Sequence, residues 1–257
     1  MSLQDKTAVI TGGLSGIGRA IAARLAAGGA RTVLFDAAGA SRDDGTPGEQ
    51  LARQLGSSVF VRGDVGEPGD VDMLFDAAVS AFGGVDILVN NAGVTAFKPL
   101  AELGIDDFDR VIRTNVRGPF LCARRAVAQM RRQPRRGVIV NVASNFAFVG
   151  ATDAVAYCAS KGAVVSMTQA LAVEAGADAI RVNALCPGAT ATEFNRAHRS
   201  RPEIAAEWEQ MTPLRLDGSR YLATPAEIAD AAAFLADETS SFMTGAALVV
   251  DGGWNAR

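Results

Sequence analysis

The chain of 257 residues is 49% hydrophobic and 21% charged, which is typical of a globular protein with a large core; because no Pro/Gly/Ser-rich linker divides it, we interpret residues 1–257 as one domain. Its net charge of −3 argues against a nucleic-acid partner, and the one basic run, within residues 131–136, is interpreted as a solvated loop. Charges interrupt every apolar stretch before about 20 residues, the start of the chain leaves no room for a signal peptide, and the three cysteines lack metal-ligand spacing, so we predict a cytoplasmic protein with reduced thiols, no membrane contact and no metal site.

Seven short aliphatic runs along the chain are predicted to form strands. They are Thr7–Thr11, Thr32–Phe35, Val59–Arg62, Asp86–Asn90, Gly137–Val142, Ile180–Leu185 and Ala247–Val250. Apolar residues at helical spacing predict helices between them, over Gly16–Ala27, Glu49–Leu55, Pro68–Phe82, Asp106–Arg132, Ala154–Ala175 and Pro225–Leu235. Continuous apolar strands that alternate with helices predict an α/β fold, a doubly wound parallel sheet with helices on both faces. Such sheets bind ligands beyond the C-terminal ends of their strands, so the segments after each strand are the candidates for chemistry.

A glycine-rich segment follows the first predicted strand and opens the first predicted helix. It reads Thr-Gly-Gly-Leu-Ser-Gly-Ile-Gly over residues 11–18, and its candidate ligand-binding residues are Gly12, Ser15, Gly16, Ile17 and Gly18. Glycines let the backbone turn tightly and approach a pyrophosphate, which the free amides of a helix N-terminus stabilise. The spacing differs from the usual Gly-x-Gly-x-x-Gly fingerprint, so a tight turn without a ligand remains an alternative.

Asp36 ends the second predicted strand, eighteen residues after Gly18. A carboxylate near this spacing binds the hydroxyl groups of an adenosine ribose and repels a 2′-phosphate. Arg42 is the nearest cation after it, in a loop rich in Gly, Asp and Pro that we expect to be flexible. The sequence therefore favours NAD over NADP, with a turn-capping role for Asp36 as the alternative.

Polar or small residues also follow the third, fourth and sixth predicted strands. They are Asp64, Val65, Asn91, Ala92, Gly93, Pro187, Gly188 and Thr192. Small residues and amides suit close packing beside a flat cofactor, and the Thr192 hydroxyl suits a carboxamide. Each could instead be a turn or a helix cap.

Tyr157 and Lys161 are four residues apart in a segment of good helix-forming composition. This spacing places both side chains on one helix face, one turn apart. A phenol is a poor base at neutral pH, and an adjacent ammonium group is expected to lower its pKa. The pair is a candidate for acid–base catalysis, although a solvated helix face is the more common role for such a pair in isolation.

These segments together resemble the short-chain dehydrogenase/reductase family over essentially the whole chain. The resemblance is carried by Thr-Gly-x3-Gly-Ile-Gly at 11–18, Asn-Asn-Ala-Gly at 90–93, Asn115, Ser144, Tyr157-x3-Lys161, Pro187-Gly188 and Asp251-Gly-Gly. It implies a Rossmann-type fold and reversible hydride transfer between a nicotinamide and an alcohol or carbonyl.

The resemblance also implies residue roles. Tyr157 is the general acid or base, Lys161 holds the nicotinamide ribose and lowers the pKa of the tyrosine, and Ser144 orients the substrate oxygen. Asn115 positions a water that links the lysine to solvent. The remaining implied contacts are to the cofactor: Asp36 to the ribose hydroxyls, Asp64 and Val65 to the adenine, Asn91 and Gly93 beside the riboses, and Thr192 to the carboxamide.

Two segments are expected to select the substrate. Ser144 is followed by Asn145, Phe146, Ala147 and Phe148 where the family commonly has small residues, which places an amide and two aromatic rings near the expected substrate mouth. Residues 189–222, with a helical stretch over Pro202–Met211, have the length of a lid. The lid arginines at 196, 199 and 201 either contact an anionic substrate or point to solvent.

The sequence thus predicts an NAD(H)-dependent oxidoreductase acting on a small-molecule secondary alcohol or its ketone, such as a polyol, a sugar acid, a cyclic alcohol or a hydroxyacyl compound. An NADPH-dependent 3-oxoacyl-[acyl-carrier-protein] reductase is the alternative enzyme, and a non-catalytic dinucleotide-binding scaffold is the alternative of another class. The resemblance further implies a homotetramer, or a dimer, that packs through the helices at 106–132 and 154–175.

Overall fold

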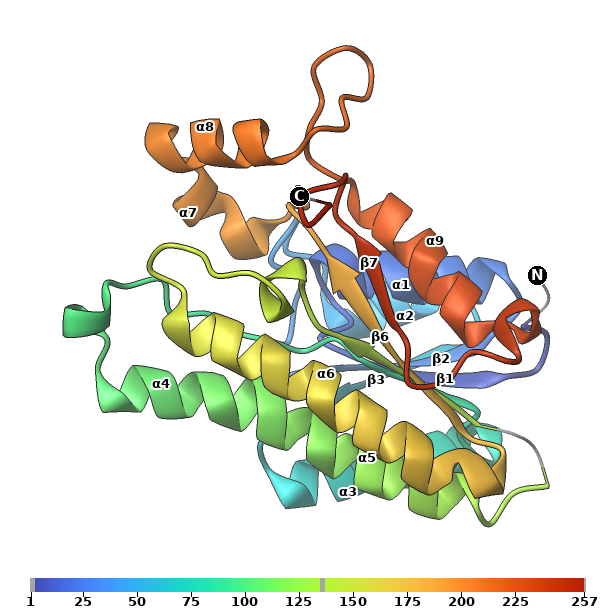
Figure 1. Ribbon diagram of the computed structural model, residues 1–257. Coiled ribbons are helices and arrows are strands. Elements are labelled where there is room, and N and C mark those ends of the chain that lie inside the picture. Colours follow the sequence, from blue (N-terminus) through green and yellow to red (C-terminus); the bar gives the residue numbers. More distant parts are fainter. Residues whose placement is uncertain (1–2, 135–136, 257) are drawn as a thin grey trace.

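The computed structural model describes residues 3–134 and 137–256 and contains one seven-stranded parallel sheet (Figure 1). The strands are β1 (Thr7–Thr11), β2 (Arg31–Asp36), β3 (Ser58–Arg62), β4 (Ile87–Asn90), β5 (Val138–Val142), β6 (Arg181–Pro187) and β7 (Ala247–Val250). Their order across the sheet is β3-β2-β1-β4-β5-β6-β7. The direction of strand order reverses between β1 and β4, which is the point where doubly wound sheets bind their ligands. The predicted fold class is confirmed.

The central strands are buried along their whole length because helices cover both faces of the sheet. All five residues of β1 are buried, as are all five of β5. One core cluster joins the sheet to α1 (Gly16–Ala27), α2 (Gly48–Leu55) and α9 (Pro225–Ala236). A second joins the opposite face to α3 (Pro68–Phe82), α5 (Gly118–Met130) and α6 (Val155–Ala175). Figure 1 shows these two helix layers on either side of the strands.

The long predicted helix over Asp106–Arg132 is interrupted. It consists of α4 (Ile105–Ile112), one π-helical turn over Arg113–Arg117, and α5. The wide turn lies at Asn115, which is 1% exposed. Single π turns inside α-helices occur frequently at functional sites, because the extra residue redirects a side chain. This turn was not predicted from the sequence.

The other predicted elements agree with the structure to within one or two residues at each end. The predicted helical stretch Pro202–Met211 is α8, and a short helix, α7 (Arg196–Arg199), precedes it. Together they project beyond the C-terminal end of β6 (Figure 1). This segment is the predicted lid.

Membrane-spanning helices, cysteines and the basic run were the subject of three predictions. No helix within 3–134 and 137–256 is long and apolar enough to cross a bilayer. All three cysteines are free thiols; Cys122 and Cys186 are buried, whereas Cys158 is half-buried. In the basic run, Arg131 pairs with Asp178 at 2.7 Å, while residues 135 and 136 lie outside the described part of the chain.

Candidate active site

A cavity of about 430 Å³ lies at the C-terminal ends of the strands and is lined by the segments that follow β1 to β6. Most of the predicted site residues line it. These are Gly12, Ser15, Gly16, Ile17, Asp36, Asp64, Val65, Asn91, Ala92, Gly93, Ser144, Asn145, Phe146, Tyr157, Lys161, Pro187, Gly188 and Thr192. Gly18 and Asn115 do not line the cavity, and both support it from behind.

The glycines after β1 shape a turn that other residues could not form. Gly12 and Gly16 have φ angles of 64° and 52°, in the left-handed region that favours glycine. A Cβ on Gly18 would lie 2.1 Å from the carbonyl oxygen of Gly12, so a side chain there would break the turn. Gly18 therefore allows α1 to pack closely against the turn, whereas Gly12 and Gly16 form its cavity surface.

Asn91 fixes this turn to the neighbouring strand. Its amide nitrogen donates to the carbonyl oxygens of Thr11 and Gly12 at 3.0 and 3.1 Å. In the other direction, the Thr11 hydroxyl accepts from the backbone N–H groups of Asn91 and Ala92, each at 3.0 Å. Thr11 was absent from the predicted site residues, because a threonine at a strand end gives no signal of such a bridge.

The loop after β2, residues 37–47, lies against the glycine turn. Asp43 accepts a hydrogen bond from the backbone N–H of Gly16 at 2.8 Å, and the Ser15 hydroxyl accepts from the backbone N–H of Arg42 at 2.7 Å. The Arg19–Asp44 ion pair, at 2.8 Å, anchors the same loop to α1. A carboxylate at the first amide of α1 is stabilised by the positive end of the helix dipole.

The predicted ribose-binding carboxylate is at the edge of this turn. Asp36 accepts from the backbone N–H groups of Leu14 at 3.4 Å and Ala38 at 3.0 Å. Arg42 also lines the cavity. Both a negative and a positive group therefore border the adenosine end of the cleft.

Asp64 is already engaged within the protein. Its carboxylate accepts from Arg113 at 2.9 Å and from the backbone N–H of Gly66 at 2.8 Å. Arg113 belongs to the π turn and also pairs with Glu67. Val65 packs against the start of α5, since a Cβ on Gly118 would lie 2.7 Å from its methyl group. These contacts explain how the segment after β3 is held at the cavity wall.

Tyr157, Lys161 and Ser144 meet at the other end of the cavity. Tyr157 and Lys161 lie one turn apart on α6, and the Lys161 ammonium is 5.5 Å from the centre of the Tyr157 ring. Lys161 donates to the carbonyl oxygen of Val142 at 2.8 Å. Ser144, directly after β5, donates to the amide oxygen of Asn145 at 3.2 Å and accepts from the backbone N–H of Phe146 at 3.2 Å. The predicted helix-face pair is thus directed inward, not to solvent.

Burial governs the ionisation of the pair in the protein alone. It raises the pKa of Tyr157 well above its ordinary value of 10.0, and the hydrogen bond with Ser144 opposes this only in part. Burial also lowers the pKa of Lys161 from 10.5 to about 8. In this state of the protein desolvation is the largest influence, so the pKa of Tyr157 is raised. The partial lowering of that pKa by Lys161, with a further contribution from a bound nicotinamide, remains a prediction.

Asn115 braces the wall next to Lys161. Its amide donates to the carbonyl oxygen of Val94 at 2.9 Å and to the Ser160 hydroxyl at 3.0 Å, and it accepts from the backbone N–H of Val94 at 2.8 Å. A Cβ on Gly93 would lie 3.4 Å from the Asn115 side-chain oxygen and 3.8 Å from the Lys161 ammonium. Gly93 therefore leaves an opening between these two polar groups.

The residues of the cleft fit a dinucleotide. A Cβ at Gly16 would lie 3.3 Å from the Thr192 methyl group, so the lid segment closes over the glycine turn. A Cβ on Gly188 would lie 2.6 Å from the main chain of Asp251, so only glycine allows this close approach. The contact explains why the Pro187-Gly188 and Asp251-Gly-Gly motifs occur together. The cavity runs from Asp36 past a backbone-lined turn to Tyr157, matching a molecule with a ribose, a pyrophosphate and a reactive ring.

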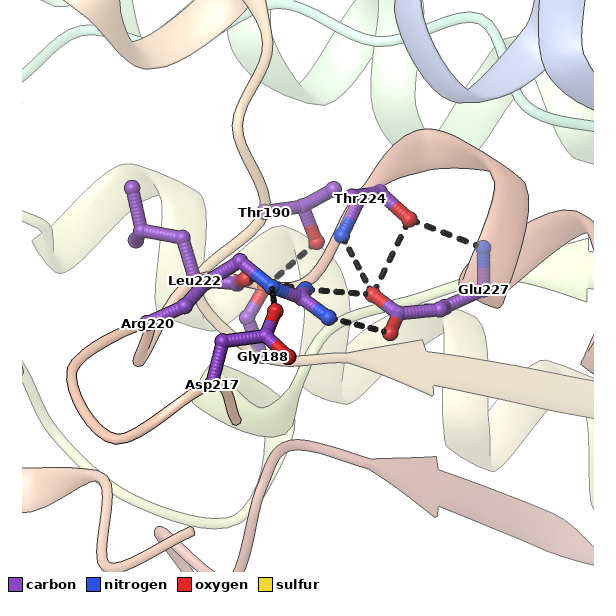
Figure 2. Close-up of polar contacts among 7 residues, drawn as sticks. All are labelled: Gly188, Thr190, Asp217, Arg220, Leu222, Thr224 and Glu227. Carbon is purple, nitrogen blue, oxygen red and sulfur yellow. Dashed lines mark hydrogen bonds and ion pairs between the residues drawn. The ribbon is translucent and has the colours of Figure 1, made fainter. Parts of the chain in front are cut away.

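The base of the lid is tied together where its two ends meet (Figure 2). The backbone of Ala223 forms two hydrogen bonds with residues 189–191. Its N–H donates to the Ala189 carbonyl at 2.9 Å, and its carbonyl accepts from the Ala191 N–H at 2.8 Å. Arg220 and Glu227 form a two-pronged ion pair with both distances at 2.9 Å. Glu227 also accepts from the backbone N–H of Thr224, completing a capping box at the start of α9. The hydrogen bonds from Arg220 and Thr224 lower the pKa of Glu227 to about 2.

Arginines of the lid are engaged with the protein. Arg196 pairs with Glu193 at 2.8 Å, Arg201 pairs with Asp153 and Glu203, and Arg199 donates to Asn195. Of these three arginines, none lines the cavity. The contacts favour the solvent-facing alternative over an anionic substrate.

Aromatic residues line the substrate end of the cavity, and the sequence predicted only part of them. Phe146 lines the cavity as predicted, but Phe148 is 49% exposed and is not among the lining residues. The lining residues that were missed are Phe97, Phe194, Trp208 and Trp254. The lid sequence contains Phe194 and Trp208, which was the available signal; Phe97 and Trp254 reach the site from segments more than 100 residues apart in the sequence.

A family model described as enoyl-(acyl carrier protein) reductase matches residues 12–255. The chain is 37% identical to 3beta-hydroxysteroid dehydrogenase 1 of Eggerthella lenta, over 98% of this chain and 94% of the relative. It is 36% identical to 2-(R)-hydroxypropyl-CoM dehydrogenase of Xanthobacter autotrophicus, over 98% and 99% of the two chains.

Solved structures are similar throughout the chain. A short-chain type dehydrogenase/reductase from Mycobacterium marinum superposes with a TM-score of 0.90 at 32% identity, covering 100% of this chain and 98% of the other. A 3-ketoacyl-(acyl-carrier-protein) reductase from Brucella melitensis, complexed with NADH, gives a TM-score of 0.86 at 37% identity, covering 98% and 99%.

Proposed function

Because this chain belongs to the short-chain dehydrogenase/reductase family, whose members among its relatives oxidise or reduce small molecules, we propose that it is an NAD(H)-dependent enzyme interconverting a secondary alcohol and a ketone. The observation that carries the proposal is the meeting of Tyr157, Lys161 and Ser144 at one end of a cavity whose other end contains Asp36. A non-catalytic scaffold would have no need of this inward-facing trio.

In the proposed mechanism, Tyr157 exchanges a proton with the substrate oxygen. The dinucleotide, when bound, supplies or accepts the hydride. Ser144 donates a hydrogen bond to the same oxygen, for which its hydroxyl must turn from Asn145. Because burial raises its pKa, Tyr157 carries its proton at neutral pH and is ready to protonate a carbonyl oxygen during reduction.

Lys161 serves two purposes in this scheme. Its hydrogen bond to the Val142 carbonyl holds the ammonium on the cavity side of α6, where it can contact a ribose hydroxyl. As a cation beside the phenol ring, it favours the phenolate that alcohol oxidation requires. The opening at Gly93 between Lys161 and Asn115 supports a path for protons to solvent through a water.

Tyr157→Phe tests the assignment directly. NADH binding, followed by fluorescence titration, should be unchanged, while turnover of alcohols and ketones should fall by at least about a hundredfold, since general acid–base catalysis contributes roughly 10²–10⁴-fold. Undiminished turnover would remove Tyr157 from the mechanism. Failure of the wild-type protein to bind either dinucleotide would reject the proposed function as a whole.

Selectivity for NAD rests on Asp36, and Arg42 provides the reason to consider NADP. The carboxylate of Asp36 lies on the glycine turn and repels a 2′-phosphate, whereas Arg42, which also lines the cleft, would attract one. Asp36→Ala should raise NADPH affinity relative to NADH, and Arg42→Ala should have little effect if NAD is the cofactor. If Arg42→Ala instead weakens NADPH binding strongly and wild type prefers NADPH, the 3-oxoacyl-[acyl-carrier-protein] reductase alternative gains support.

We also propose a homotetramer, with a dimer as the alternative. Large apolar side chains are exposed on the outer helices, including Phe120 on α5 and Val155 and Val173 on α6, and Phe242 is fully exposed before β7. Exposed apolar groups at two places suit two kinds of subunit contact. Light scattering coupled to size exclusion would give the mass, and Phe242→Asp should reduce a tetramer to a dimer.

A further inference from the structure

We propose that the active site takes an apolar ring compound, a secondary alcohol or ketone whose reacting carbon is part of or attached to a hydrocarbon ring, and not a polyol, a sugar acid or another anion. The inference rests on the proposed function and narrows its substrate class. It is carried by an aromatic chamber, defined as Phe97, Phe146, Phe194, Trp208 and Trp254, which surrounds Tyr157.

Three-dimensional neighbours among the chamber rings, together with Tyr157 and His198, form a closed circuit. Neighbouring ring centres are 6.5 Å apart for Tyr157–Phe146, 5.8 Å for Phe146–Trp254 and 6.4 Å for Trp254–Trp208. The circuit returns from Trp208 through His198 at 6.0 Å and Phe97 at 4.0 Å, and Phe97 is 6.0 Å from Tyr157.

Phe194, at 6.1 Å from Tyr157, adds a further ring on the lid side. Trp208 and Trp254 are 6% and 5% exposed, so the outer wall is held in place by packing. A substrate oxygen within reach of Tyr157 therefore places the attached carbon skeleton among aromatic faces and edges, which attract hydrocarbon surface.

Most of the polar groups that border the chamber are bound by the protein. The Thr190 hydroxyl donates to the Gly188 carbonyl, and the amide of Asn195 donates to the Thr190 carbonyl while accepting from Arg199. Asn145 is 3% exposed; its amide oxygen accepts from Ser144, whereas its amide nitrogen has no hydrogen-bond partner among the described residues and could donate to one substrate oxygen. A polyol would bury its remaining hydroxyl groups against rings without hydrogen-bond partners, which is unfavourable for each of them.

The charged residues that line the cavity near the chamber also disfavour an anionic substrate. Among the lining residues that the lid contributes, the charged one is Glu193, and its carboxylate is paired with Arg196 at 2.8 Å. Arg110, which lines the cavity from α4, is engaged by Asp107 at 3.2 Å and by the Thr95 carbonyl at 3.3 Å. A carboxylate or phosphate on the substrate would have to displace one of these partners.

The nicotinamide of the proposed function would balance the reaction in this chamber. In oxidation, the carbinol C–H bond breaks and its hydride, with both electrons, passes to the nicotinamide, while the O–H proton passes to the Tyr157 phenolate. The carbon–oxygen double bond forms as these two bonds break. Reduction reverses each transfer, so no further oxidant or reductant is required.

The two tryptophans of the chain, at 208 and 254, both line the chamber, so intrinsic tryptophan fluorescence reports its occupancy without turnover. In Tyr157→Phe, titration with 2-decalone should change the fluorescence in a saturable way, whereas fructose and 5-ketogluconate should leave it unchanged at equal concentration. In the wild type with NADH, kcat/KM should be at least about 100-fold higher for 2-decalone and cyclohexanone than for the two sugar ketones.

Phe194→Ala should lower kcat/KM for 2-decalone about tenfold, with NADH affinity unchanged. Phe194 is 40% exposed, so its removal is compatible with folding. The matched control is Phe148→Ala, because Phe148 is 49% exposed and lies outside the chamber; this variant should have no effect. Equal or better turnover of the sugar ketones, or an unchanged Phe194→Ala enzyme, would overturn the inference while leaving the proposed function intact. Saturable binding of 2-decalone without turnover of any ketone would uphold the ring-binding chamber and reject the proposed oxidoreductase activity instead.

Discussion

Replacing Lys161 by methionine should change how the stability of the protein depends on pH. Lys161 is 5% exposed, and burial lowers its pKa from 10.5 in the unfolded chain to about 8 in the folded protein. Between these two values the unfolded chain holds a proton that the folded protein has released. Unfolding then takes up a proton, so the free energy of unfolding contributed by this group rises with pH. Below pH 8 both states are protonated, and the full penalty of the buried charge is present.

The size of the effect follows from the same two values. Each pH unit between them corresponds to about 1.4 kcal/mol, so the whole interval is worth about 3 kcal/mol, and the part from pH 8 to 9.5 about 2 kcal/mol. The methionine variant also loses the hydrogen bond to the Val142 carbonyl, a loss of about 1–3 kcal/mol that does not vary with pH. The pH dependence of the difference between the two proteins is therefore the informative quantity, not its value at one pH.

Urea unfolding of wild type and Lys161→Met, measured at pH 7, 8, 9 and 9.5, gives this difference. Burial also raises the pKa of the thiols of Cys122 and Cys158, which makes both proteins less stable at alkaline pH and cancels in the comparison. Burial raises the pKa of the Cys186 thiol too, but Lys161 opposes this, so both proteins are compared in a Cys186→Ala background. Wild type should gain about 2 kcal/mol relative to the variant between pH 7 and 9.5. A difference that stays constant over this range would refute the argument that Lys161 is held in the protein at the expense of stability. Lys98→Met, which removes a surface lysine paired with Asp107, controls for general loss of charge.

Three further outcomes follow from contacts around the cleft. Asp43→Asn removes the carboxylate from the Gly16 amide and should tighten NADH binding several-fold in a fluorescence titration; weaker binding would mean that Asp43 helps to form the site. Gly18→Ala places a Cβ 2.1 Å from the Gly12 carbonyl and should abolish NADH binding and lower the melting temperature, whereas Gly69→Ala, with no atom within 4 Å of its Cβ, should retain binding. Glu227→Gln breaks the ion pair at the lid base and should raise KM for the ketone more than the Kd for NADH; equal effects on both would show that the pair merely stabilises the fold.

The local sequence pattern was sufficient to predict the fold and the kinds of side chain that line the site. The sheet was predictable because buried parallel strands need continuous apolar runs, such as Thr7–Thr11, and their covering helices need the helical period. Tyr157 and Lys161 were predictable as a unit because four residues on a helix place two side chains on one face. Glycine at 12 and 16 was informative because few other residues adopt positive φ.

Other properties depend on atoms that are far apart in the sequence, and tertiary structure alone decided them. Whether Tyr157 is a phenol or a phenolate depends on how completely the surrounding chain excludes water, and burial raises its pKa more than the hydrogen bond with Ser144 lowers it. The π turn at Asn115 exists because its amide binds Val94 and Ser160, neither of which is near it in the chain. The aromatic chamber likewise brings Phe97 and Trp254, which are 157 residues apart in the sequence, to the same end of the cavity as Tyr157. Packing and desolvation sum over all neighbours in space, whereas a motif records only neighbours along the chain.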